Sequence, residues 1–142
     1  MEYLLTKEIE RDITARRDET LDLLKELCKI PAPSNHEEKR AAWIKSWLEN
    51  LGAQGVYVDS ALNVVYPVGC EGRRDLVVFM AHTDTVFPDT EPMPMREEGG
   101  RLFCPGVGDD TANVALLLTV VKYVTEKKLT HDCGMLFVFN SG

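Results

Sequence analysis

Two short apolar runs with a helical segment between them constrain the fold of this chain more than any other feature. The runs cover residues 76–80 and 133–139. Continuous apolar runs of this length are typical of strands buried on both faces of a parallel sheet. Residues 111–128 between them are predicted to form a helix. The order strand, helix, strand predicts a βαβ crossover. We therefore expect an α/β fold with three αβα layers: a mixed, mostly parallel sheet with helices on both faces.

The sequence before these runs predicts two helices. Apolar residues recur at helical spacing over residues 4–29. Ser34 and Glu37 have the spacing of a capping box, so a second helix should begin there and end before Gly52. The remaining predicted strands cover residues 56–58 and 62–66, which form a hairpin, and residues 101–103, inside a long loop.

Charge and apolar length exclude two classes of partner. With 16 basic and 23 acidic residues, the 142-residue chain has a net charge of −7 and a pI near 5.0, which argues against nucleic acid. The longest apolar stretch, residues 114–121, is too short to span a membrane. Residues 1–8 carry charges where a secretory signal would be apolar, so we expect a cytoplasmic protein. The four cysteines lack C-x-x-C spacing, which indicates neither a disulfide framework nor a structural zinc site.

A histidine and an aspartate follow the first apolar run. His82 and Asp84 are two residues apart, so in an extended chain their side chains point the same way. A carboxylate beside an imidazole fixes its tautomer and makes the other ring nitrogen a better metal donor. The alternative is a strand-end histidine beside a turn-forming aspartate, and this pattern alone does not decide between the two.

A second acidic segment precedes the helix predicted at residues 111–128. Asp110 is the expected helix N-cap, which leaves Asp109 in a glycine-containing loop that can approach a ligand closely. Because ligands of open α/β sheets bind beyond the carboxyl ends of the strands, Asp109 is expected to face His82 there. The Gly106-x-Gly108 pair lacks the preceding strand and the third glycine of a dinucleotide-binding motif. His36 and His131 are expected to be solvated surface residues.

Several ordered motifs resemble one enzyme family. Residues 30–38 are similar to its opening I-P-S/A-x-S-x-x-E segment, residues 80–86 match its metal motif G/A-H-x-D-x-V, and residues 101–110 resemble its G-x-L-Y-G-x-G-x-x-D segment. The chain thus resembles the N-terminal part of the catalytic domain of the co-catalytic zinc aminoacylase and carboxypeptidase family. That family includes acetylornithine deacetylases, succinyl-diaminopimelate desuccinylases, glutamate carboxypeptidases and peptidase T.

The resemblance implies a metal-dependent hydrolase of amide bonds. His82 would ligate one zinc ion, Asp84 would orient His82 as a catalytic-site residue, and Asp109 would bridge two metal ions. It implies two Zn²⁺ ions, with Co²⁺ or Mn²⁺ as substitutes, and a peptide or N-acyl amino acid as substrate. Carboxypeptidase, dipeptidase and deacylase activities all stay open. The family's general base is a glutamate just after the strand equivalent to residues 135–139.

The resemblance also implies an incomplete zinc-exopeptidase fold. Residues 1–142 would be the first part of the catalytic domain, without the remaining ligands or the lid and dimerisation domain, so we expect little activity from this chain alone. Ending at the last strand would also leave apolar surface and a sheet edge uncovered, so we expect the chain to self-associate as a homo-oligomer. Cys104 stands where the family usually has glycine, and it is either a packed thiol or an added metal ligand. A non-catalytic binding or oligomerisation module that keeps the α/β scaffold is the rival interpretation.

Overall fold

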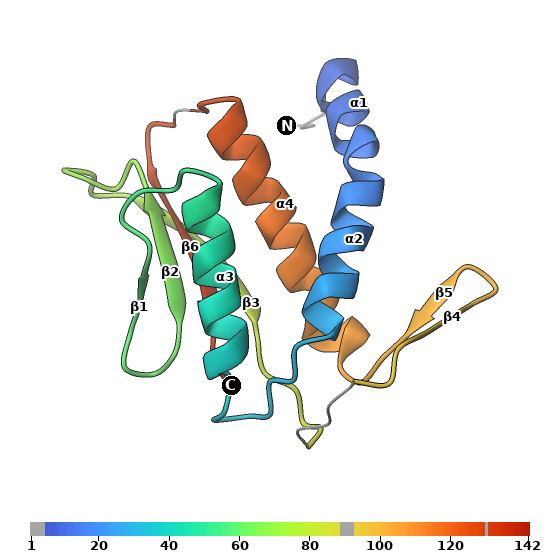
Figure 1. Cartoon of the computed structure of the whole chain (residues 1–142). Coiled ribbons are helices and arrows are strands. Elements are labelled where there is room, and N and C mark those ends of the chain that lie inside the picture. The colour runs from blue at the N-terminus through green and yellow to red at the C-terminus, as the bar shows by residue number, and fades with distance from the viewer. Residues whose placement is uncertain (1–4, 89–92, 130) are drawn as a thin grey trace.

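A computed structural model describes residues 5–88, 93–129 and 131–142, and its centre is a mixed four-stranded sheet with the strand order β1-β2-β6-β3 (Figure 1). The four strands are β1 (Tyr57–Val58), β2 (Val64–Val68), β3 (Leu76–His82) and β6 (Gly134–Asn140). β6 pairs in parallel with β3 and antiparallel with β2, and β1 pairs antiparallel with β2. A separate hairpin is formed by β4 (Arg96–Glu98) and β5 (Arg101–Phe103).

Four α-helices accompany the sheet in the described part of the chain. They are α1 (Lys7–Ala15), α2 (Arg17–Cys28), α3 (Glu38–Asn50) and α4 (Ala112–Glu126), and a single turn of π-helix, η1 (Val107–Thr111), leads directly into α4. The predicted helix over residues 4–29 is therefore two helices that meet at Arg16. Gly52 has a φ of +92° just after α3, which is the left-handed conformation that the predicted helix end requires.

The core lies on one face of the sheet. Phe137 and Phe139 of β6 are fully buried, and their register partners Tyr66 and Val64 in β2 belong to the same apolar cluster. Because alternate residues of a strand share a face, these side chains mark a single face. The cluster is completed by residues from three helices, namely Leu23 and Leu27 of α2, Ile44 and Leu48 of α3, and Val114, Leu118 and Val121 of α4.

The α/β class and the mixed sheet are confirmed, but three details differ from expectation. Only one of the three strand pairings in the described sheet is parallel, and α2, α3 and α4 share one face rather than covering both (Figure 1). β3 was expected to be buried on both faces, yet residues 76–80 are 38–61% exposed. The reason is position, since β3 is an edge strand of this sheet and the apolar composition of a strand does not reveal its neighbours.

The predicted capping box at Ser34 and Glu37 is wrong. α3 begins at Glu38, its N-cap Glu37 makes no side-chain capping bond, and Glu37 Oε1 instead accepts the Asn35 amide at 2.8 Å. Ser34 Oγ donates to a carboxylate oxygen of Asp84, 50 residues further along the chain. A long-range partner has replaced the local one.

The crossover from β3 through α4 to β6 was predicted, and it positions the candidate site. His82 and Asn140 are the last residues of the two parallel strands, and they are register partners. The amide of the next residue, Thr83, donates to the Asn140 carbonyl at 2.7 Å. The η1 turn before α4 packs against β3. The ends of two strands and the beginning of a helix therefore meet at one place, as expected for open α/β sheets. In the described part of the chain, no helix is both long enough and apolar enough to cross a membrane.

Candidate metal site

The His82 ring lies between two carboxylates. Its Nδ1 is 2.9 Å from Asp84 Oδ1, and its Nε2 is 3.1 Å from Asp109 Oδ1. The structure thus brings together all three side chains that the sequence singled out, two from the end of β3 and one from the turn before α4. Asp84 is buried, whereas the Asp109 side chain is 95% exposed. The site therefore has a fixed inner side and an open outer side.

Asp84 is held as an ionised acceptor. Its Oδ2 accepts a hydrogen bond from Ser34 Oγ at 2.5 Å, and its Oδ1 faces His82. Burial raises the pKa of Asp84, but the hydrogen bonds from Ser34 and His82 outweigh burial and hold that pKa below its usual value. Because the carboxylate is an acceptor, His82 Nδ1 is the donor, and in the neutral ring this leaves the lone pair on Nε2, which faces Asp109.

The loop that carries Asp109 depends on close packing. Gly106 has a φ of +70°, and a Cβ atom at this position would lie 2.4 Å from Thr85 Cγ2. The Asp109–Asp110 peptide bond is cis, and Asp109 has the non-helical angles φ −135° and ψ 92° inside the η1 turn. The close contact with Thr85 thus places the beginning of this loop directly against the residue that follows Asp84.

Asp110 has a different role from the one predicted. The residue at the N-cap of α4 is Thr111, without a side-chain capping bond, and Asp110 Oδ2 instead accepts the backbone amide of His82 at 3.0 Å. Its other oxygen accepts the side-chain amide of Asn113. Asp110 therefore links the end of β3 to the beginning of α4, a contact over 28 residues that local helix-capping rules do not predict.

The charges around His82 favour its protonated form when no metal competes. Burial lowers the pKa of His82, but the hydrogen bonds to Asp109 and Asp84 raise it more, so the pKa lies above its ordinary value. The same two carboxylates that stabilise a proton on this ring would also stabilise a metal cation beside it.

The donor atoms that are present fit part of a zinc coordination sphere. Two ligands on one tetrahedral zinc ion, with bonds of about 2.0–2.2 Å, lie about 3.3 Å apart. His82 Nε2 and Asp109 Oδ1 are 3.1 Å apart, close to this value. Within the described residues, however, no group of three or more His, Cys, Asp or Glu side chains is arranged to hold a metal ion. The residues that the structure describes thus offer two candidate ligands, fewer than the three that a catalytic zinc normally takes from protein.

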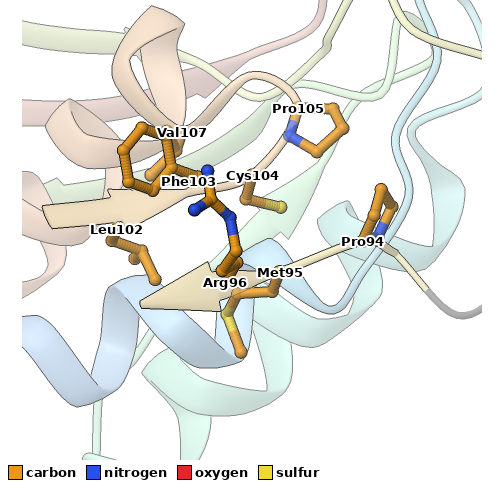
Figure 2. A pocket seen from close by; sticks show the side chains of 8 residues that line it. All are labelled: Pro94, Met95, Arg96, Leu102, Phe103, Cys104, Pro105 and Val107. Atoms are coloured by element: carbon orange, nitrogen blue, oxygen red, sulfur yellow. The ribbon is translucent and has the colours of Figure 1, made fainter. Parts of the chain in front are cut away.

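The site opens into a cavity of about 360 Å³. His82, Asp84 and Asp109 line it together with Cys104 and Val107. Cys104 and Val107 also line a neighbouring cavity of about 550 Å³. Figure 2 shows Met95 and Arg96 of one hairpin segment and Leu102 and Phe103 of the other around this second cavity. The Arg96 guanidinium lies 4.3 Å from the centre of the Phe103 ring and is paired with Glu98, so its charge is already engaged.

Cys104 borders the site with its thiol engaged elsewhere. Its Sγ lies 3.5 Å from the Cys28 carbonyl oxygen, and burial raises the pKa of Cys104. Burial also raises the pKa of the neighbouring Cys28 thiol, to about 12. Both groups therefore remain thiols near neutral pH, and thiolate is the form that binds metal. His36 and His131 are exposed, as predicted.

Comparisons with known proteins find similar sequences and similar folds. Residues 78–142 match the model of peptidase family M20/M25/M40. A protein described as a putative [LysW]-lysine/[LysW]-ornithine hydrolase from Pyrococcus abyssi is 35% identical over 102 residues, which are 72% of this chain and 28% of that protein. One with the same description from Pyrobaculum aerophilum is 33% identical over 89 residues, or 63% of this chain and 24% of its own length. This chain therefore spans about a quarter of the length of the curated relatives it matches.

Solved structures show the same fold at lower sequence identity. Human carnosine dipeptidase 1 is 20% identical, with a TM-score of 0.74 over 99% of this chain and 35% of its own. The Bacillus subtilis YXEP protein, described as a dinuclear metal-binding peptidase from the M20 family, is 13% identical, with a TM-score of 0.63 over 91% of this chain and 36% of its own. The family match, the sequence relatives and the common fold together show that this chain is similar to members of peptidase family M20/M25/M40.

Proposed function

We propose that this chain carries part of the metal site of a hydrolase that cleaves amide bonds in peptides or N-acyl amino acids. The observation that carries the proposal is the His82 ring, which Asp84 holds at Nδ1 and which faces Asp109 with Nε2. The relatives described as hydrolases and the fold neighbours described as peptidases support the reaction class. Because the chain spans about a quarter of its relatives, we propose that it corresponds to the N-terminal part of a catalytic domain.

Each of the three side chains has a distinct role in this proposal. His82 and Asp109 are metal ligands, and Asp84 keeps His82 in the tautomer that binds metal through Nε2. Zinc in such a site supplies a Lewis acid that polarises the substrate carbonyl and lowers the pKa of bound water. The buried side of the site fixes the ring, and the exposed Asp109 side leaves room for substrate. The four free cysteines support a reducing, cytoplasmic compartment.

A cobalt titration tests the proposal directly. Co²⁺ replaces zinc in many sites and has visible absorption bands that report its ligands. We expect saturable binding of Co²⁺ to the purified chain, displaced by Zn²⁺ and abolished by a chelator. Because two ligands come from the described residues, the affinity should be weak. Absence of any specific Co²⁺ spectrum at millimolar metal would count against the metal site and favour the non-catalytic binding module.

Replacing Asp84 by asparagine should weaken metal binding without removing a ligand. The Asp84→Asn side chain keeps its shape but loses the charge that fixes the His82 tautomer, and changes of this kind cost about 10- to 100-fold in metal affinity. The measurement is the Co²⁺ dissociation constant by calorimetry. Asp132→Asn is the matched control, since it removes one charge from an exposed residue before the other end of β6. Equal affinities for the two variants would show that Asp84 does not orient the ring.

The exposed strand β3 should make this chain self-associate. Residues 76–80 present apolar side chains, 38–61% exposed, on an edge strand of the described sheet, and edge strands are the usual sites of pairing between chains. A Val78→Lys substitution places a charge in the middle of this edge, and we expect it to shift the chain toward monomer in light scattering. Tyr57→Lys, which changes a half-exposed residue on the opposite edge strand, is the control and should have little effect. A wild-type chain that stays monomeric at high concentration would contradict this expectation.

A further inference from the structure

Arg40 of α3 is buried beneath the candidate metal site. Only 1% of this residue is exposed, and it is the largest of the fully buried side chains in the described structure. Its Nη1 donates to the Thr83 carbonyl at 2.7 Å and to Thr111 Oγ1 at 3.2 Å. Its Nη2 donates to the carbonyls of Leu27 at 3.1 Å and Ile30 at 2.6 Å. One guanidinium thus binds four acceptors.

The four acceptors lie on three separate segments, and two of these segments carry the site. Thr83 is the residue between His82 and Asp84, and its own side chain is fully buried. Thr111 ends the η1 turn that holds Asp109. The third segment is the end of α2 and the turn after it, which Arg40 reaches through Leu27 and Ile30. Arg40 therefore joins the strand end that carries His82 to the turn that carries Asp109.

The buried charge of Arg40 is unusual for a purely structural residue. None of the ion pairs found among the described residues includes Arg40, its hydrogen-bond acceptors are all neutral, and its Nε atom is buried without a partner. Burial lowers the pKa of Arg40, while the Cys28 and Cys104 groups and the negative charge of Asp84 oppose that change. Burying a charge without an oppositely charged partner costs stability unless hydrogen bonds compensate. The benefit of arginine here is geometric, because its planar fork of donors reaches several acceptors at once.

We infer that Arg40 is a positioning residue that sets the distance between His82 and Asp109. The inference rests on the proposed function, because it concerns the same metal site. Without the guanidinium, the Thr83 carbonyl and the Thr111 hydroxyl lose their common donor, and the strand end and the η1 turn are free to move apart. Arg40 touches neither candidate ligand, so its effect passes through the backbone on either side of them.

The test compares Arg40→Met and Arg40→Lys with Leu48→Ala. Leu48 is fully buried in the same helix and belongs to the apolar cluster, so Leu48→Ala destabilises the fold without altering the hydrogen bonds of Arg40. Arg40→Met should weaken Co²⁺ binding by about 10- to 100-fold relative to Leu48→Ala, as changes in groups that support ligands do. Arg40→Lys should recover part of this loss, because its single ammonium keeps the charge but cannot reach all three segments.

Hydrogen exchange supplies a second readout that needs no metal. The His82 amide donates to Asp110 Oδ2 at 3.0 Å and the Thr85 amide to the Ala32 carbonyl at 2.7 Å. The quantity to compare is the exchange rate of these two amides divided by the exchange rate of the slowest amides of β6. This ratio should rise at least about tenfold in Arg40→Met and in Arg40→Lys, and it should not change in Leu48→Ala. An unchanged ratio in Arg40→Lys, or a cobalt affinity in Arg40→Met equal to that of Leu48→Ala, would overturn the inference. If the wild-type chain binds no cobalt, the proposed function fails, and the exchange ratio alone decides whether Arg40 joins the two segments.

Discussion

Replacing His82 by alanine should lower the affinity of this chain for Co²⁺ by more than about 100-fold. The expected loss exceeds the 10- to 100-fold cost typical of residues that only support a ligand, because His82 supplies the one neutral nitrogen donor of the candidate site. The fold should persist, since the His82 side chain is 36% exposed and lies outside the apolar cluster. Calorimetric titration gives the affinity, and urea unfolding checks that stability changes by no more than about 1 kcal/mol.

Two other histidines provide matched controls for this substitution. His36 and His131 are exposed and lie outside the cavity that His82 lines. His36→Ala and His131→Ala should therefore bind Co²⁺ as the wild-type chain does. If His82→Ala kept its affinity while either control lost it, the metal site would lie elsewhere on the surface. If all three variants bound equally, the observed cobalt would be bound nonspecifically.

Replacing Gly106 by alanine should destabilise the fold by about 2–5 kcal/mol. A left-handed backbone conformation costs a non-glycine residue about 1–2 kcal/mol, and overpacking adds about 1–3 kcal/mol. Both terms apply, because Gly106 has a φ of +70° and its added Cβ would lie 2.4 Å from Thr85 Cγ2. Urea unfolding measures the change. Metal affinity should fall as well, since Gly106 begins the loop that brings Asp109 to His82.

Gly100 separates the two contributions. Its φ of +74° is nearly that of Gly106, but a Cβ atom there would have no neighbour within 4 Å. Gly100→Ala therefore retains only the backbone cost, about 1–2 kcal/mol. Adding Thr85→Ser to Gly106→Ala removes the clashing methyl group and should recover part of the stability in a double-mutant cycle. Equal losses for Gly106→Ala and Gly100→Ala would show that the loop yields to the added methyl group without cost.

The part of the site that could be predicted rests on short-range geometry and on one general rule of sheet topology. His82 and Asp84 were expected on the same side because they are two residues apart in extended chain, and their side chains are in contact. Asp109 was expected opposite His82 because parallel strands and the helix between them bring their ends together, and the two side chains meet. Metal binding by these residues remains a prediction.

The failures share a physical cause. Local capping rules predicted a nearby hydrogen-bond partner for Ser34 and for Asp110. Ser34 instead contacts Asp84, and Asp110 instead contacts His82, both far away in sequence. The free-energy difference between two such hydrogen bonds is small, about 1 kcal/mol, so packing of the whole fold decides which one forms. The sequence pattern also gave no sign of Arg40, since an arginine near the beginning of a helix usually lies in solvent.

Local sequence patterns were enough to predict the α/β class, the crossover from the strand before His82 to the strand after α4, and the three side chains of the candidate site. These follow from hydrophobic periodicity, residue spacing and turn residues, all of which act over a few neighbours in the chain. The tertiary structure alone decided that β3 is an edge strand, that the helices α2, α3 and α4 share one face, and that Arg40 joins the segments of the site. Those features depend on contacts between residues that are distant in sequence, and these contacts form only when the whole chain packs.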